Sequence, residues 1–346
     1  MFNSQNTMKL HHIPRLAMVA LAILAGSAGT ALPVHGAEPT QWRMATEYPA
    51  NTMPGEGVST FAMEVKSRTA GALEILPSYD ASAGIKSADI PKAVRDGALD
   101  AGDAYGGALA GLDPVFALSS LPFVVDNIED AQRLLELARP LYAKAFEALG
   151  QHLLYVTPWP ASGIWSSKPA SGVDALRTLS IRTYDVTSAS VMQAAGARAE
   201  FLSFSELPAR LSAGTINAAL SSGDGAAGRK LWGWLPYFTT IEYAMPLSFA
   251  TVSARAYAAL SPEQRRAVDQ AAQATETQQW QRLRNRGEDN RQNMQRSGVT
   301  IAPPSAELRQ TLQRAGEQAV AEWERKAGHD AAAVLQQFRS APGEAR

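Results

Sequence analysis

Residues 179–184 read Leu-Ser-Ile-Arg-Thr-Tyr, and a second short run, Ile-Asn-Ala-Ala-Leu-Ser-Ser, occupies residues 216–222. Both runs have the length and apolar character of β-strands. Arg182 stands at the end of the first run, and its planar guanidinium is suited to pairing with a carboxylate through two parallel hydrogen bonds. The alternative is an arginine in an ordinary surface ion pair. The rest of the chain favours the first interpretation, in which Arg182 points into a cleft.

Strand and helix patterns alternate on both sides of Arg182. The sequence predicts strands at 41–46, 73–76, 99–105, 153–157, 164–166 and 199–202, and helices at 55–69, 90–96, 128–148, 188–194 and 204–213. Such alternation is typical of α/β proteins with parallel sheets and right-handed crossovers, in which ligands lie beyond the carboxyl ends of the strands. Pro158-Trp159-Pro160 looks like a crossing between domains. We therefore expect a two-domain α/β fold of the periplasmic-binding-protein type, with a hinge and a cleft.

The stretch from Ser261 to Gly298 is unusually long for a helical pattern. Ser261 is suited to the N-cap and Pro262 to the first turn, and neither Pro nor Gly follows until Gly287. The stretch is either two helices that meet at Gly287 or one helix of roughly 54 Å that lies across both domains. A further helix is predicted at 306–326, where one apolar stripe is expected to pack in the core.

The N-terminus has the pattern of a secretory signal. Lys9 and Arg15 precede an apolar run at 16–32, and Val34-His35-Gly36-Ala37 offers small residues for cleavage. A permanent membrane anchor is the alternative. We expect residues 1–37 to be removed and the protein to work in a bacterial periplasm. The two lost positive charges would change the net charge from −1 to −3.

Composition argues against several other classes. The chain of 346 residues has a net charge of −1, without the basic excess of a nucleic-acid-binding protein. It contains no cysteine, which excludes disulfides and thiolate metal sites. Past residue 37 only His152 and His329 remain, far apart in the sequence, so neither a catalytic triad nor a histidine zinc site is expected.

Residues 223–228 fit the pattern Gly-x-Gly-x-x-Gly, and Glu242 follows at the distance of a dinucleotide-binding fingerprint. Pro236 and the nearby aromatic residues leave little room for the helix and strand that this motif needs. We expect a flexible glycine loop at the mouth of the cleft instead, and neither cofactor nor metal.

The predicted strand ends supply candidate ligand contacts besides Arg182. The polar candidates are Glu47, Tyr48, Asp103, Tyr105, Ser221 and Ser222, and the aromatic candidates are Trp159, Trp165 and Tyr184. Trp159 and Trp165 are suited to form the wall against an apolar part of a ligand.

Several segments in this order resemble the DctP-type solute-binding proteins of tripartite ATP-independent periplasmic (TRAP) transporters. They include Glu47-Tyr48-Pro49, residues 93–100 (Ala-Val-Arg-Asp-Gly-Ala-Leu-Asp), Leu121-Pro122-Phe123, the Arg182 strand and Leu260-Ser261-Pro262-Glu263-Gln264. The likeness extends over about residues 41–325. It implies a two-domain binding protein with a domain-spanning helix, which captures a small organic acid and delivers it to a membrane permease of two subunits. It also implies that Arg182 pairs with the ligand carboxylate.

On this basis residues 38–158 and about 249–285 are expected to form domain I, and residues 159–248 and about 286–340 domain II. The family often has a second arginine after the first crossing, but residues 159–165 contain none. The tryptophans there favour a monocarboxylate with an apolar or aromatic body over a sialic-acid-like or C4-dicarboxylate ligand. We expect a monomer that binds no nucleic acid and is not an enzyme. The alternatives are an exported enzyme acting on a carboxylated substrate and a ligand sensor for a membrane receptor.

Overall fold

The computed structural model describes residues 39–228 and 230–340. The predicted signal segment at residues 1–37 lies outside the described residues. None of the helices in the described part of the chain is both long and apolar enough to cross a membrane.

The first of two β-sheets has five strands in the order β2-β1-β3-β10-β4. Their bounds are β1 (Thr40–Thr46), β2 (Leu73–Ser78), β3 (Ala101–Tyr105), β4 (Gln151–Pro158) and β10 (Leu247–Ser253). β1 pairs in parallel with both β2 and β3, whereas β10 is antiparallel to both of its neighbours. We call this sheet and the elements packed on it the first lobe.

The second sheet has six strands in the order β11-β9-β5-β8-β6-β7. Their bounds are β5 (Ser162–Ser166), β6 (Ser180–Thr183), β7 (Arg198–Phe201), β8 (Ala218–Ser222), β9 (Tyr237–Thr239) and β11 (Thr300–Ala302). β6 is parallel to β7 and β8, and β5 is antiparallel to β8 and β9. This sheet and its packed elements form the second lobe.

The expectation of parallel sheets is wrong in one respect, because each sheet contains one reversed strand. β5 is the first strand after the chain leaves β4 for the second sheet, and β10 is the first after its return. A strand that arrives from another sheet has no crossover helix to set its direction, so it is free to pair antiparallel. The crossing at Pro158-Trp159-Pro160 lies between β4 and β5.

The helices agree with most of the predicted bounds. The α-helices are α1 (Met53–Arg68), α2 (Ile90–Arg95), α3 (Ile128–Ala148), α4 (Val173–Arg177), α5 (Val186–Ala194), α6 (Leu207–Ser212), α7 (Gly223–Gly228), α8 (Ala254–Ala258), α9 (Pro262–Arg296), α10 (Ala306–Lys326) and α11 (Gly328–Ser340). The 3-10 helices are η1 (Ser87–Asp89), η2 (Gly106–Leu109), η3 (Pro114–Ser120), η4 (Phe204–Glu206) and η5 (Leu231–Gly233).

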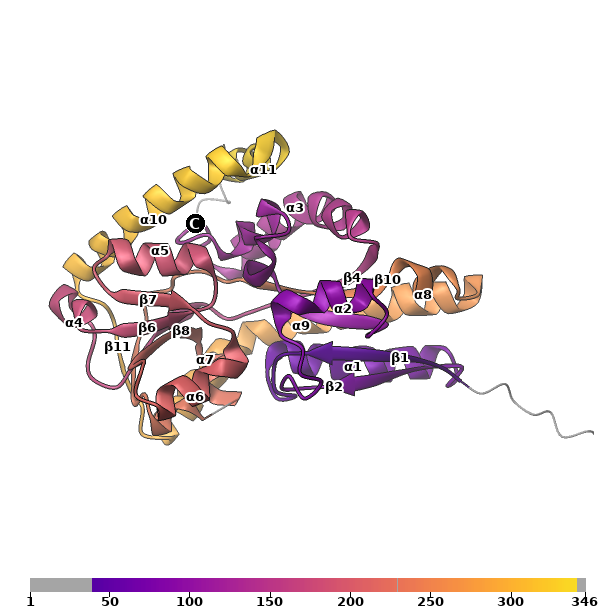
Figure 1. The fold of residues 1–346 in the computed structure, drawn as a ribbon, viewed down its shortest axis with the longest axis horizontal. Helices are drawn as coiled ribbons and strands as arrows, with labels where there is room; N and C mark the ends of the chain where they lie inside the picture. Colours follow the sequence, from indigo (N-terminus) through magenta and orange to yellow (C-terminus); the bar gives the residue numbers. More distant parts are fainter. Residues whose placement is uncertain (1–38, 229, 341–346) are drawn as a thin grey trace, which may run out of the picture. The chain divides into compact units, whose positions relative to one another are not determined.

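The long stretch is one helix, α9, that continues through Gly287. Its N-terminus has a capping box between Ser261 and Gln264. Val268 lies in the core that surrounds β1 and α1, whereas Met294 lies in the core of the second lobe. Figure 1 shows this helix, in orange, passing behind the first lobe toward the second.

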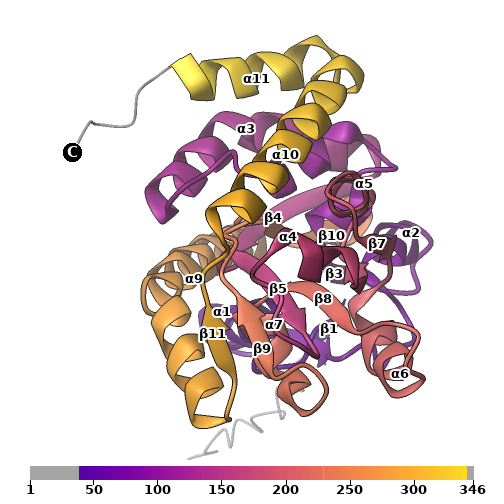
Figure 2. The same cartoon turned by 90° about the vertical axis from the view of Figure 1, so that its left-hand side faces the viewer.

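The C-terminal helices also connect the two cores. Leu308 and Leu312 of α10 lie in the core of the second lobe, and Trp323, near its end, lies in a core cluster with residues of α3. Figures 1 and 2 both show α11 lying beside α3. The division into domains I and II at the predicted boundaries remains a prediction.

The glycine-rich segment is the short helix α7, which corrects the expectation of a flexible loop. The Ser222 hydroxyl accepts a hydrogen bond from the Gly225 N–H at 3.4 Å and so turns the chain out of β8. A Cβ atom on Gly225 would lie 3.2 Å from the Ser221 Oγ, so the turn packs closely on the strand end.

Candidate functional site

A small cavity of about 30 Å³ lies between the two lobes, and Arg182 is among the residues that line it. Most of the residues predicted from the sequence line it too: Tyr48, Tyr105, Trp159, Tyr184, Ser221 and Ser222. Ser162, Phe204, Gly225 and Pro246 complete the lining. We call it the Arg182 cavity. It adjoins the carboxyl ends of β6 and β8, where open α/β sheets bind their ligands.

Arg182 is held in place by backbone carbonyls. Its Nε donates to the Leu202 oxygen at 2.8 Å, and its Nη1 donates to the Leu220 oxygen at 3.3 Å. A guanidinium has five N–H donors, so the end of the fork formed by Nη1 and Nη2 keeps donors for a ligand. The side chain interacts electrostatically with Glu47, but it forms no salt bridge with any residue in the described parts of the chain.

Burial gives this arginine a strong electrostatic role. Arg182 is 3% exposed, and burial lowers its pKa, although Tyr48, Glu47, Tyr105 and Tyr184 act in the opposite direction. An arginine remains protonated even so. A buried cation without an ionic partner carries a desolvation cost, and a ligand carboxylate can offset that cost.

Aromatic rings form one wall of the Arg182 cavity. The ring of Tyr48 lies edge-on to Trp159, with centroids 4.7 Å apart, and 5.3 Å from the ring of Phe204. The Trp159 Nε1 donates to the Ser248 hydroxyl at 2.9 Å, which fixes the indole plane. The wall suits the apolar face of a small ring or chain.

Two tyrosine hydroxyls are available in the same cavity. Neither Tyr105 OH nor Tyr184 OH has a hydrogen-bond partner of good geometry among the residues that the structure describes, although the Tyr184 hydroxyl interacts with those of Ser162 and Tyr105. Their rings meet at 5.3 Å, and burial raises the pKa of both well above the usual range. Both therefore stay protonated and can donate to an acceptor on a ligand.

A second cavity of about 200 Å³ adjoins the first and also involves Arg182. Tyr48, Tyr105, Tyr184 and Phe204 line both cavities, and Glu47 lines only the second. We call it the Glu47 cavity. The Glu47 Oε2 accepts from the Ser87 N–H at 2.9 Å, and its Oε1 accepts from the N–H and hydroxyl of Ser205 at 2.9 and 3.0 Å. Since Ser87 is in η1 and Ser205 in η4, this carboxylate joins the two lobes.

Two predicted residues line neither cavity. Asp103 is fully buried in β3 and accepts a hydrogen bond from the Thr46 hydroxyl at 3.2 Å. Trp165 is fully buried in β5 and packs on Phe238 with ring centroids 5.0 Å apart. The sequence predicted both as ligand contacts at strand ends, but both side chains are buried within their lobes, away from the two cavities.

Among the lining residues missed at the sequence level, two had a recognisable signal. Ser162 starts β5 directly after the crossing, and Phe204 comes shortly after the carboxyl end of β7. Pro246 gave no signal, because its position depends on the return crossing from the second sheet. Gly225 belonged to a segment expected to be a loop.

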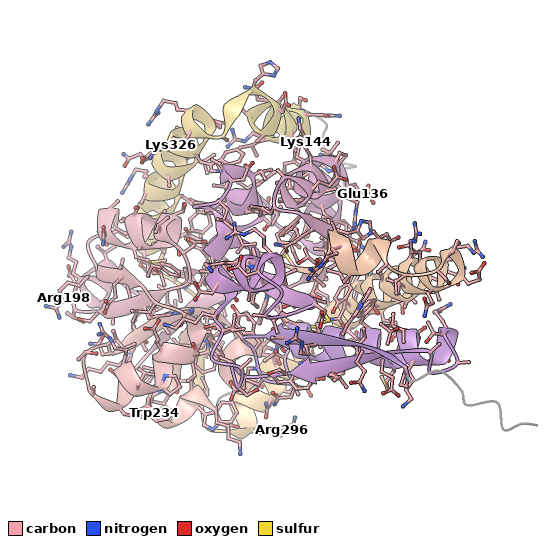
Figure 3. All side chains as sticks on the ribbon, turned by 45° about the vertical axis from the view of Figure 1, so that its right-hand side comes forward. Glu136, Lys144, Arg198, Trp234, Arg296 and Lys326 are labelled. Carbon is pink, nitrogen blue, oxygen red and sulfur yellow. The ribbon has the colours of Figure 1, made fainter. Side chains whose placement is uncertain are left out.

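Other features of the sequence stay outside the site. No group of metal-ligating side chains that could hold an ion occurs in the described residues. His152 stacks on Tyr257 with ring centroids 4.2 Å apart, and His329 is exposed. Figure 3 shows Trp234 at the surface of the second lobe, where it is 41% exposed.

Two α/β lobes with a buried arginine between them are the arrangement expected of a hinge-closing binding protein. The sequence matches the model of the family described as bacterial extracellular solute-binding protein, family 7 (DctP), over residues 44–326. The chain belongs to this family, as its resemblance predicted, and is a substrate-binding protein of the TRAP type.

Similar proteins support this assignment. DctP7 of Bordetella pertussis, an extracytoplasmic solute receptor binding pyroglutamic acid, is 30% identical with a TM-score of 0.84 and covers 87% of this chain and 100% of its own. A pyroglutamate-specific TRAP solute-binding protein of an unidentified marine microbe is 24% identical, with a TM-score of 0.84. The match covers 88% of this chain and 100% of that protein. A solute-binding protein of Chromohalobacter salexigens is 24% identical over 75% of this chain and 79% of its own.

Proposed function

We propose that this protein captures a compact monocarboxylate with a neutral polar group, for which pyroglutamate is the reference compound. The observation that carries the proposal is the buried Arg182 with donors left on its fork. The similar DctP7 protein, which binds pyroglutamic acid, supports the same class of ligand.

The charges around the cavities favour a single carboxylate. Lys86 also lines the Glu47 cavity, but it is paired with Glu206 at 3.1 Å. A second ligand carboxylate in that cavity would face Glu47, and like charges in a buried site repel strongly. Glu47 instead suits an N–H donor on the ligand, because a carboxylate has about four acceptor positions and three are occupied.

The role in the cell follows from this class of protein. We expect export through the segment at 1–37, work in the periplasm as a monomer, and delivery of the acid to the two membrane subunits of a TRAP permease. We expect the acid to be bound without turnover and no affinity for nucleic acid. Family membership and the near-neutral net charge support these expectations.

The test is calorimetry on the mature protein with L-pyroglutamate, its carboxamide analogue, a C4-dicarboxylate and an aromatic keto acid. We expect binding of pyroglutamate and loss of binding with the carboxamide, which lacks the charged group. Recovery of the bound acid unchanged by mass spectrometry would support a binding protein. Binding of the carboxamide as tightly as the acid would contradict the carboxylate anchor.

Arg182→Ala and Arg182→Lys test the anchor itself. We expect each to weaken binding at least tenfold, because a lysine ammonium cannot reproduce the planar fork. Arg177→Ala is the matched control, since Arg177 forms an exposed pair with Asp174 in the same lobe. Equal affinities of the wild type and the Arg182 variants would remove this residue from the site.

A further inference from the structure

Asp224 joins the ligand cavity to the opposite lobe, although sequence reasoning gave it no role. It is the second residue of α7 and follows Ser221 and Ser222, which line the Arg182 cavity. Gly225, the next residue, lines that cavity as well. The side chain of Asp224 is only 1% exposed. A buried carboxylate needs hydrogen bonds or ionic partners, and its partners come from outside the second sheet.

The first partner is the N-terminus of α1 in the first lobe. The Met53 N–H donates to the Asp224 Oδ2 at 2.7 Å, across 171 residues of sequence. The first N–H groups of a helix have no partner inside the helix, so Asp224 satisfies one of them from the opposite lobe. This charge-assisted bond also suits the positive end of the helix dipole.

The second partner is Arg286 of α9, which forms a salt bridge through its Nε with the Asp224 Oδ1. Arg286 also donates from Nη1 to Glu56 of α1 at 3.0 Å and from Nη2 to the Asn51 oxygen at 2.6 Å. Burial alone would lower the pKa of Arg286, but the Asp224 and Glu56 carboxylates raise it. One guanidinium therefore binds α7 and the start of α1 together.

We infer that Asp224 is a positioning residue that locks the lobes around the ligand and sets how slowly the ligand leaves. We call Asp224, Arg286, Glu56 and the Met53 N–H the Asp224 clasp. The inference rests on the proposed function, since it concerns retention in the Arg182 cavity. When the lobes separate, the Met53 bond must break, and Ser221, Ser222 and Gly225 move away from the cavity together with α7.

This arrangement predicts an effect on dissociation more than on association. Contacts that exist only in the closed state are absent when the ligand first enters, so they change the rate of leaving. A purely structural role would lower stability without changing the rate at which the ligand dissociates.

The experiment is stopped-flow measurement of association and dissociation on wild type, Asp224→Asn and Arg286→Ala, with L-pyroglutamate. We expect each variant to release the ligand at least fivefold faster while its association rate stays within twofold of the wild type. Arg266→Ala is the matched control, because it breaks an exposed pair with Glu263 on the same helix. An unchanged dissociation rate in both clasp variants would overturn the inference.

A second measurement separates this inference from the identity of the ligand. The chain has no cysteine, so Lys92→Cys in the first lobe and Arg198→Cys in the second can be labelled cleanly for single-molecule energy transfer. Figure 3 shows Arg198 at the surface of the second lobe. Without any ligand, Asp224→Asn should lower the population of closed molecules. If the wild type binds no acid, the proposed function fails, and an unchanged closed population in Asp224→Asn would then overturn the clasp on its own.

Discussion

Asp103 shows how a single residue can limit stability even beside a binding site. Its carboxyl is fully buried in β3, and its Oδ2 has no hydrogen-bond partner among the described residues. Burial raises its pKa to about 7, opposed only by the bond from Thr46. Below about pH 7 the folded protein therefore prefers the protonated, uncharged form of this side chain.

This environment predicts a pH dependence with a definite sign. In the unfolded chain Asp103 would lose its proton near pH 4, but in the folded chain it keeps the proton up to about pH 7. Because the folded state holds more protons between these values, the free energy of unfolding falls as the pH rises through this range. The total loss is of the order of 4 kcal/mol at about 1.4 kcal/mol per pKa unit.

The measurement is urea unfolding of wild type and Asp103→Asn at several pH values between 4 and 8. The asparagine side chain does not titrate. The free energy of unfolding of Asp103→Asn minus that of the wild type should therefore increase as the pH rises and level off above about pH 7. Parallel curves for the two proteins would show that Asp103 is ionised in the folded state or does not control stability.

At the scale of elements, the approach of η2 to the start of α5 depends on one glycine. A Cβ atom on Gly107 would lie 2.5 Å from the Asp185 Oδ2, 2.6 Å from the Tyr105 Cε1 and 3.1 Å from the Ser120 Oγ. Asp185 caps α5 in the second lobe through a bond from the Ser188 N–H at 2.7 Å, so it has little freedom to move away. Gly107 thus allows a close contact between the lobes beside a cavity-lining tyrosine.

Gly107→Ala should therefore weaken ligand binding by roughly 5- to 150-fold, since overpacking at such a contact costs about 1–3 kcal/mol. Gly111→Ala is the matched control, because a Cβ atom there meets no atom within 4 Å. Calorimetry with pyroglutamate on both variants checks this. Equal affinities for the two variants would show that the lobes do not need this contact in the bound state.

The elements also show where sequence reasoning succeeds. Helices with strong periodicity and clear caps, such as α3 and α10, were predicted at their observed bounds. For α9 the sequence was consistent with either one helix or two, because an exposed glycine such as Gly287 weakens a helix without breaking it. β5 was predicted as a strand but its reversed direction was not, since strand direction depends on which sheet the chain enters, and β10 was not predicted.

Some residues of the candidate site could be predicted from the sequence, and others could not. Arg182, Tyr184, Ser221 and Ser222 line the cavity because they stand at carboxyl ends of strands, a position that a sequence reveals. Asp224 was missed because its partners Met53 and Arg286 come from distant segments. Only the folded chain brings such residues together, so no local pattern could identify the clasp.

At the scale of the whole molecule, the lobes share their cores through helices as well as through the strand crossings. α9 and α10 each begin in one lobe and end in the core of the other. At the end of α10, the Trp323 Nε1 donates to the Pro114 oxygen of η3 at 2.8 Å, and α11 continues along α3. The C-terminal segment therefore stabilises the first lobe even though it follows a helix of the second.

This arrangement predicts that α11 supports the fold and not the ligand site. Leu335 is fully buried in the cluster that contains α3, and Arg133 of α3 lies over the Phe338 ring at 4.0 Å. Leu335→Ala should lower the free energy of unfolding by about 2–5 kcal/mol, as buried leucine truncations do. Because no α11 residue lines the Arg182 cavity, the affinity for pyroglutamate should remain within twofold of the wild type.

Urea unfolding and calorimetry check both parts, with the exposed neighbour Gln336→Ala as control. A large loss of affinity in Leu335→Ala would mean that α11, by holding α3 and α10 together, also sets the closed position of the lobes.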